Sequence, residues 1–123
     1  MTYLHNFFAI ISFIVLLLFI SIGNQSPSKA SENTKQVSNM IEAAESGNVD
    51  AQLNLGIAYA KGNGVKKDLK KAVYWLERSS KGNSARGTYL LARAYELGRG
   101  VKKDPRKAFE FMSRAEAMGI EVA

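Results

Sequence analysis

Side chains that commonly carry out catalysis are scarce in this sequence. It contains no Cys, and its only His is His5, which lies close to an N-terminal apolar segment. Nucleophilic catalysis by a Cys–His or Ser–His pair, and zinc binding by Cys or His ligands, therefore lack the residues that they need. We predict no catalytic residue, no metal site and no cofactor site.

Paired carboxylates are another route to chemistry, as in glycoside hydrolases. Asp50 and Asp68 stand where helices are expected to begin, and Glu42 and Glu45 fall on the polar face of a predicted helix. Because acidic side chains at helix N-termini are favoured by the helix dipole, a structural role explains the two aspartates. The sequence therefore favours a protein that catalyses nothing over an amidase or a β-lactamase-like enzyme.

Two clusters of basic residues have two interpretations, a docking surface or a solvated surface. The chain carries 17 Lys and Arg against 11 Asp and Glu. The clusters would dock an acidic protein, anionic lipid head groups or a polyanion, or would form a solvated surface with Lys71 and Lys107 packed over a loop, which we favour. Nucleic acid is not expected as a partner, because no aromatic residues interleave with the charge. The clusters are Lys66, Lys67, Lys70, Lys71 and Lys102, Lys103, Arg106, Lys107.

The basic clusters belong to a longer internal repeat. Eleven residues of the stretch 55–72 are identical to the residue 36 positions later. A period of this length is typical of stacked two-helix units, each of which buries its apolar face against its neighbours. The identical pairs are Leu55/Leu91, Ala58/Ala94, Tyr59/Tyr95, Gly62/Gly98, Gly64/Gly100, Val65/Val101, Lys66/Lys102, Lys67/Lys103, Asp68/Asp104, Lys71/Lys107 and Ala72/Ala108.

Hydrophobic periodicity and turn signals predict two helices in each copy. In the first copy, Gly62 and Gly64 end the first helix and call for backbone with positive φ, and Asp68 caps the second helix. Trp75 and Phe111 occupy the same position of the two copies, which indicates that a large ring is required there. The predicted helices span about 50–61, 69–81, 85–97 and 105–117.

A half-repeat precedes the first copy. Apolar residues at helical spacing predict a helix over about 34–46 that ends at Gly47. An offset of 35 residues aligns Gly47 with Gly82, so the turn after Gly82 is expected to be one residue longer than the turn after Gly47. We expect this helix to cap the N-terminal end of the stack. Its apolar residues are Val37, Met40, Ile41 and Ala44.

No capping helix is predicted after residue 117. Phe109 and Met112 are therefore expected to form an uncovered apolar face. Because short solenoids need polar caps, the sequence predicts either modest stability or a partner on this face, such as a second copy of the chain.

The repeat resembles the Sel1-like repeat, a relative of the tetratricopeptide repeat, over about residues 36–119. The second copy departs from the family pattern at Ala92, where glycine is usual, and at Phe111, where tryptophan is usual. The resemblance implies an all-α, right-handed α/α solenoid that serves as an adaptor or scaffold. The positions of the structural repeat motif are Leu55, Gly56, Tyr59, Gly62, Gly64, Asp68, Ala72 and Trp75, then Leu91, Tyr95, Gly98, Gly100, Asp104, Ala108 and Phe111.

The concave face of such a solenoid is its usual ligand surface. By analogy with tetratricopeptide repeats, the first helix of each pair lines this face. Tyr and Arg often dominate the binding energy of interfaces, whereas Leu53, Ile57 and Tyr89 would also suit packing against the next helix. The predicted partner-binding residues are Leu53, Ile57, Lys61, Arg86, Tyr89 and Arg93, with Asp50 and Leu97 on the same face.

An uncharged apolar run over residues 7–22 lies near the N-terminus. As a helix it would span roughly 24 Å, which is shorter than the hydrocarbon core of about 30 Å. We predict a signal peptide cleaved after Ala30, with Gly23 as the second choice. The alternative is an uncleaved membrane anchor. In either case residues 24–35 have the composition of a polar linker.

The predicted organisation is thus a signal peptide or membrane anchor over 1–30 and a repeat domain over 34–119. The domain divides into a half-repeat (34–47), repeat one (49–82) and repeat two (85–119). The predicted function is an exported, periplasmic or secreted module for protein–protein interaction. The alternative is a membrane-anchored envelope factor that regulates a cell-wall or secretion enzyme.

Overall fold

The computed structural model describes residues 28–120 of the chain. The chain divides into two units between Glu32 and Asn33, and the hydrophobic core lies within the second unit. The described residues form α-helices and no strand, which confirms the predicted all-α class. The helices are α2 (Lys29–Glu45), α3 (Val49–Lys61), α4 (Leu69–Lys81), α5 (Ala85–Leu97) and α6 (Pro105–Ala117).

Within residues 28–120, no helix combines the length and the apolar character needed to cross a membrane. The predicted signal or anchor segment, 7–22, lies outside the described residues.

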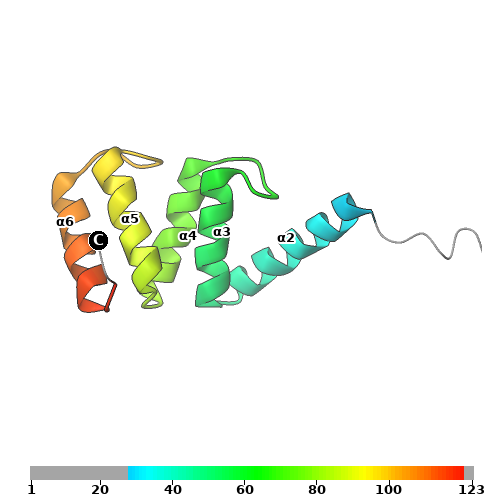
Figure 1. The fold of residues 1–123 in the computed structure, drawn as a ribbon, viewed down its shortest axis with the longest axis horizontal. Coiled ribbons are helices and arrows are strands. Elements are labelled where there is room, and N and C mark those ends of the chain that lie inside the picture. The colour runs from blue at the N-terminus through cyan, green and yellow to red at the C-terminus, as the bar shows by residue number, and fades with distance from the viewer. Residues whose placement is uncertain (1–27, 121–123) are drawn as a thin grey trace, which may run out of the picture. The chain divides into compact units, whose positions relative to one another are not determined.

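Helices α3 to α6 form two hairpins that lie side by side (Figure 1). Helix α3 packs on α4 and α5 packs on α6 within the hairpins, and the contact of α4 with α5 joins them. In each hairpin the first helix ends at a glycine in the left-handed conformation, Gly62 (φ 74°) and Gly98 (φ 66°). This is the solenoid of two helical hairpins that the repeat predicts.

Side chains cap the hairpin helices and fix where they begin. The carboxylate of Asp68 accepts a hydrogen bond from Lys71 N (3.1 Å), and that of Asp104 accepts one from Lys107 N (3.1 Å). The cap of α3 is Asn48, whose side chain accepts a hydrogen bond from the backbone N of Ala51 (2.9 Å). Helix α3 therefore begins at Val49 and includes Asp50 in its first turn.

Helix α2 begins at Lys29, earlier than the predicted start near residue 34. The polar composition of residues 24–35 indicated a linker, but residues 29–35 are helical. The carbonyl of Ser28 accepts hydrogen bonds from Ser31 N (2.8 Å) and Glu32 N (3.2 Å) and so starts the helix. Residues 29–45 contain no Gly or Pro, so the helix can include the polar, exposed residues at its N-terminal end.

The 36-residue period also holds across the half-repeat, so the predicted offset of 35 is wrong. Gly47, Asn83 and Gly119 occupy equivalent places and have φ values of 101°, 67° and 93°. Gly47 therefore aligns with Asn83 rather than with Gly82, and the two turns have the same length. Three equivalent hydrogen bonds support this: Asn48 N to Ala43 O (3.0 Å), Ser84 N to Ser79 O (3.0 Å) and Ile120 N to Ala115 O (3.2 Å).

Two apolar clusters form the core of the second unit. At Gly56 a Cβ atom would lie 2.9 Å from the Leu76 side chain, so glycine allows α3 to approach α4 closely. One cluster joins α4, α5 and α6, and the other joins the C-terminal half of α2 to α3 and α4. The first contains Val73, Leu76, Leu91, Ala94, Tyr95 and Ala108, and the second contains Ala44, Leu55 and Trp75.

Candidate functional site

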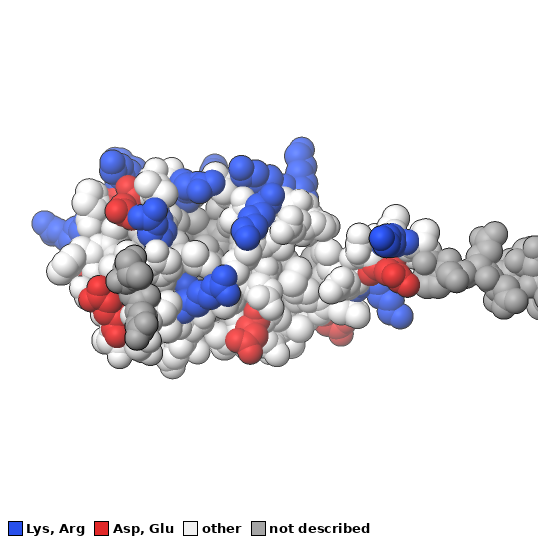
Figure 2. Space-filling model, in the orientation of Figure 1, with Lys and Arg blue, Asp and Glu red and all other residues white. Residues whose placement is uncertain are grey.

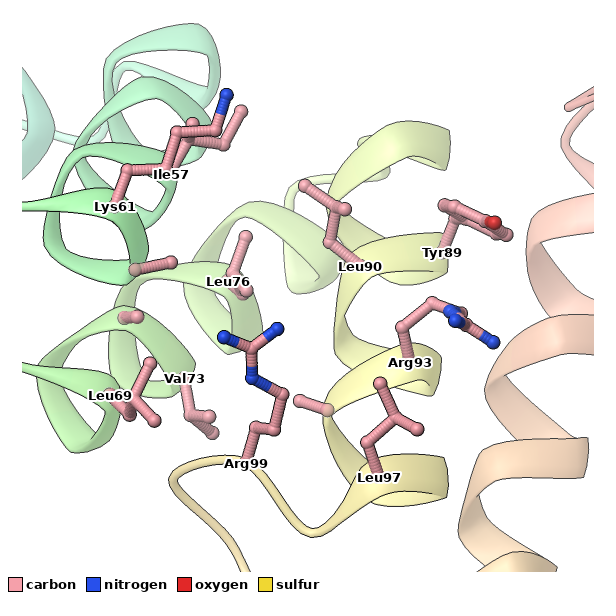
Figure 3. A pocket seen from close by; sticks show the side chains of 13 residues that line it. Ile57, Lys61, Leu69, Val73, Leu76, Tyr89, Leu90, Arg93, Leu97 and Arg99 are labelled. Atoms are coloured by element: carbon pink, nitrogen blue, oxygen red, sulfur yellow. The ribbon is translucent and has the colours of Figure 1, made fainter.

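A pocket of about 290 Å³ opens between α3, α4 and α5. Its floor is part of α4, where Ala72, Val73 and Leu76 are buried. Helices α3 and α5 form its sides, and Arg99 reaches it from the turn between α5 and α6 (Figure 3). We call this site the α3–α5 pocket. The other lining residues are Ile57, Ala60, Lys61, Leu69, Tyr89, Leu90, Arg93, Ala94 and Leu97.

Most of the predicted partner-binding residues meet at this pocket. Four of the six candidates line it, and so does Leu97. Leu53 instead packs against the core cluster between the hairpins. Arg86 and Asp50 are exposed and lie outside the pocket lining. The four candidates that line the pocket are Ile57, Lys61, Tyr89 and Arg93.

Arg99, which the helical periodicity did not predict as a binding residue, also lines the pocket. Its guanidinium extends from the turn toward Leu76, whereas the side chain of Arg93 points away from that residue (Figure 3). Arg99 lies between two turn glycines, and its counterpart in the first copy is Asn63. This break in the repeat was the one signal that could have indicated it.

All the charged side chains that line the α3–α5 pocket are positive. Lys61, Arg93 and Arg99 line it, and no Asp or Glu does. Arg93 forms an ion pair with Glu96 on the same helix, the one ion pair among residues 28–120. The charges of Lys61 and Arg99 are therefore not neutralised by an ion pair within the described part of the chain.

One lysine of each basic cluster lies over a tyrosine ring. Lys71 Nζ lies 5.4 Å from the ring centroid of Tyr59, and Lys107 Nζ lies 5.2 Å from that of Tyr95. These matched cation–π contacts support the structural interpretation of the two lysines. Figure 2 shows Lys and Arg gathered along the edge where the α3–α4 and α5–α6 turns lie, with few acidic side chains among them.

The lining of the α3–α5 pocket offers features that are suited to binding. No Asp, Glu, His, Ser or Cys lines it, so neither a carboxylate nor an imidazole base is at hand. Within residues 28–120, no three potential metal-ligating side chains cluster. What the lining offers is apolar area, a phenol ring and three cationic groups.

Comparison with known families gives a match over most of the described residues. A family model of the Sel1 repeat matches residues 49–84 and 85–120, that is, one match for each helical hairpin. Among curated proteins, no relative matches the chain.

Several solved structures share the fold. A Sel1 repeat protein from Oxalobacter formigenes is 32% identical, with a TM-score of 0.66 over 76% of this chain and 83% of its own. A protective antigen present in uropathogenic Escherichia coli strains, which displays an SLR fold, is 28% identical, with a TM-score of 0.70 over 72% of this chain and 19% of its own. The cysteine rich protein B of Helicobacter pylori is 29% identical, with a TM-score of 0.68 over 71% of this chain and 65% of its own.

Proposed function

Since this chain belongs to the Sel1-repeat family, we propose that it is a non-catalytic scaffold that binds a partner protein in the α3–α5 pocket. Proteins of this family are typically scaffolds for protein–protein interaction. The α3–α5 pocket combines an apolar floor with Tyr and Arg side chains, which are the side chains most enriched among binding hot spots.

One observation carries this proposal: the pocket lining departs from the repeat. Of its 13 residues, only Ala72 and Ala94 are identical to their counterparts in the other copy. Positions that only maintain a hairpin, such as Asp68 and Lys71, are the same in both copies. The formation of the hairpin therefore does not explain the choice of side chains in the pocket, whereas binding of a ligand does.

The test is affinity capture of a partner by the full chain and by its Tyr89→Ala/Arg93→Ala variant. The variant should lose most of the captured partner, because it removes the aromatic ring and one cationic group from the pocket. Tyr74→Ala/Lys70→Ala is the matched control, because both residues are exposed and lie on α4 outside the pocket. Equal capture by all three proteins would reject the proposal.

We also propose that the protein acts outside the cytoplasm, in the periplasm or after secretion. The support for this proposal is the uncharged apolar run over residues 7–22. If the run is retained instead, the repeat domain would act as an anchored envelope factor that regulates a cell-wall or secretion enzyme.

A further inference from the structure

Two positive charges flank the apolar floor of the α3–α5 pocket. Lys61 is the last residue of α3, and Arg99 lies in the α5–α6 turn, so the charges come from the two hairpins. Both residues are exposed, and no Asp or Glu lines the pocket with them. Because the floor excludes water from one side, a charge of opposite sign would be attracted more strongly here than on an open surface.

The framework of the repeat does not require these two charges. The counterpart of Lys61 in the second copy is Leu97, and the counterpart of Arg99 in the first copy is Asn63. By contrast, Lys71 recurs as Lys107, and each lies over a tyrosine ring. Lys61 and Arg99 thus lack the repeated intrachain contact that accounts for Lys71 and Lys107.

The volume of the pocket limits what it can hold. At about 290 Å³ it lies at the small end of ligand pockets, which are typically about 300–1,000 Å³. A pocket of this size accepts the side chains of a short peptide segment. Leu69, Leu76 and Leu90 offer that segment an apolar surface, and the guanidinium of Arg99 can bind a carboxylate through two parallel hydrogen bonds.

We infer that the partner presents an acidic segment, in which an apolar side chain fills the α3–α5 pocket and neighbouring carboxylates bind Lys61 and Arg99. This inference rests on the proposed function and adds the chemical class of the partner. It explains why the floor is apolar, why the flanking charges have one sign, and why both break the repeat.

Selection from a random peptide library displayed on phage tests the inference, and the partner need not be identified first. The full chain should enrich peptides in which Asp or Glu stands next to Leu, Ile or Phe. An enriched peptide should bind Arg99→Glu about tenfold or more weakly, which is the loss expected for one charge-assisted hydrogen bond. Arg99→Asn, which copies the first repeat, should weaken binding less than Arg99→Glu does.

The matched control is Lys66→Glu, an equal charge change in the α3–α4 turn at an exposed residue outside the α3–α5 pocket. It should leave peptide affinity within about twofold, because the charge that it changes is solvent-exposed and screened. Uncharged or basic peptides, no enrichment at all, or equal losses for Arg99→Glu and Lys66→Glu would overturn the inference. Binding of phosphatidylglycerol vesicles in place of peptides would also overturn it.

A second variant separates failure of this inference from failure of the proposed function. Leu90→Ser changes the apolar lining and leaves the charges in place. If Leu90→Ser abolishes capture of a partner protein and Arg99→Glu does not, the scaffold function stands and the acidic partner is excluded. If neither variant affects capture, the proposed site itself is wrong.

Discussion

Gly87 of α5 lies so close to Ser79 of α4 that a Cβ atom at residue 87 would be 2.1 Å from Ser79 Oγ. The contact between the two hairpins therefore requires glycine at this place. The residues 36 positions earlier are Ala51, which corresponds to Gly87, and Ala43, which corresponds to Ser79. The larger residue at the first position is thus accompanied by a smaller residue at the second.

Gly87→Ala should lower the free energy of unfolding by about 1–3 kcal/mol, the usual cost of overpacking, although alanine favours helix more than glycine does. Urea denaturation followed by circular dichroism measures the change. Ser79→Ala in the same chain should restore part of the loss, because it removes the closest atom. A Gly87→Ala protein as stable as wild type would show that α4 and α5 do not meet as described.

A buried pair of hydroxyl groups also joins α4 and α5. Ser80 Oγ and Thr88 Oγ1 are 2.7 Å apart, and Thr88 donates its proton to the carbonyl of Ser84 (2.8 Å). Because Thr88 has one hydroxyl proton, Ser80 must be the donor in their mutual hydrogen bond. Thr88→Val would leave a buried donor without its acceptor.

Thr88→Val should therefore lower the free energy of unfolding by about 1–3 kcal/mol. Adding Ser80→Ala should cost less than the sum of the two single changes, because it removes the unpaired donor. The exposed Ser38→Ala serves as a control and should have little effect. Strictly additive effects in the double-mutant cycle would contradict the hydrogen bond.

The exposed face of α6 predicts self-association. Phe109 is 73% exposed, whereas its counterpart Val73 is 5% exposed and packs near the turn glycine Gly100 of the next hairpin. We expect sedimentation equilibrium to show reversible association that Phe109→Ser weakens, with no loss of stability because the ring is exposed. Tyr74→Ser, which removes another exposed ring, should leave the association unchanged. A wild-type chain that stays monomeric at high concentration would refute this prediction.

Export can be tested at the N-terminus of the protein. Cleavage after Ala30 should give a mature chain that begins at Ser31, which removes only the first residues of α2. The part of α2 that packs against the core, around Met40 to Ala44, is then retained. Mass spectrometry of the protein isolated from producing cells should find this N-terminus. The mass of the whole chain would instead identify a membrane anchor.

The helices could be predicted from the sequence where local signals agree. Helices α4, α5 and α6 begin and end where the caps, glycine turns and Pro105 place them. The start of α2 could not be predicted, because a solvent-exposed helix of polar residues has no apolar periodicity. The offset of the half-repeat was missed because Asn83 adopts a positive φ, as glycine does, so an alignment that matched glycine with glycine chose Gly82.

The α3–α5 pocket could be predicted only in part, because helical periodicity indicates which residues share a helix face but not where a turn places its side chains. The periodicity of α3 and α5 placed Ile57, Tyr89 and Arg93 on one face, and they line one pocket. The position of Arg99 depends on the path of the α5–α6 turn back toward α4, which no local pattern encodes. Leu53 shares the face by spacing, but it lies nearer the start of α3 and packs against the core.

If another protein occupies the α3–α5 pocket, site-specific photo-crosslinking in cells should trap it there. A benzophenone amino acid in place of Tyr89 should cross-link a distinct protein, and Arg99→Glu in the same chain should reduce the yield. The same label in place of Tyr74, which is exposed on α4 outside the pocket, should not cross-link that protein. No cross-link from residue 89, or the same product from residues 89 and 74, would show that the pocket is not where a partner protein binds.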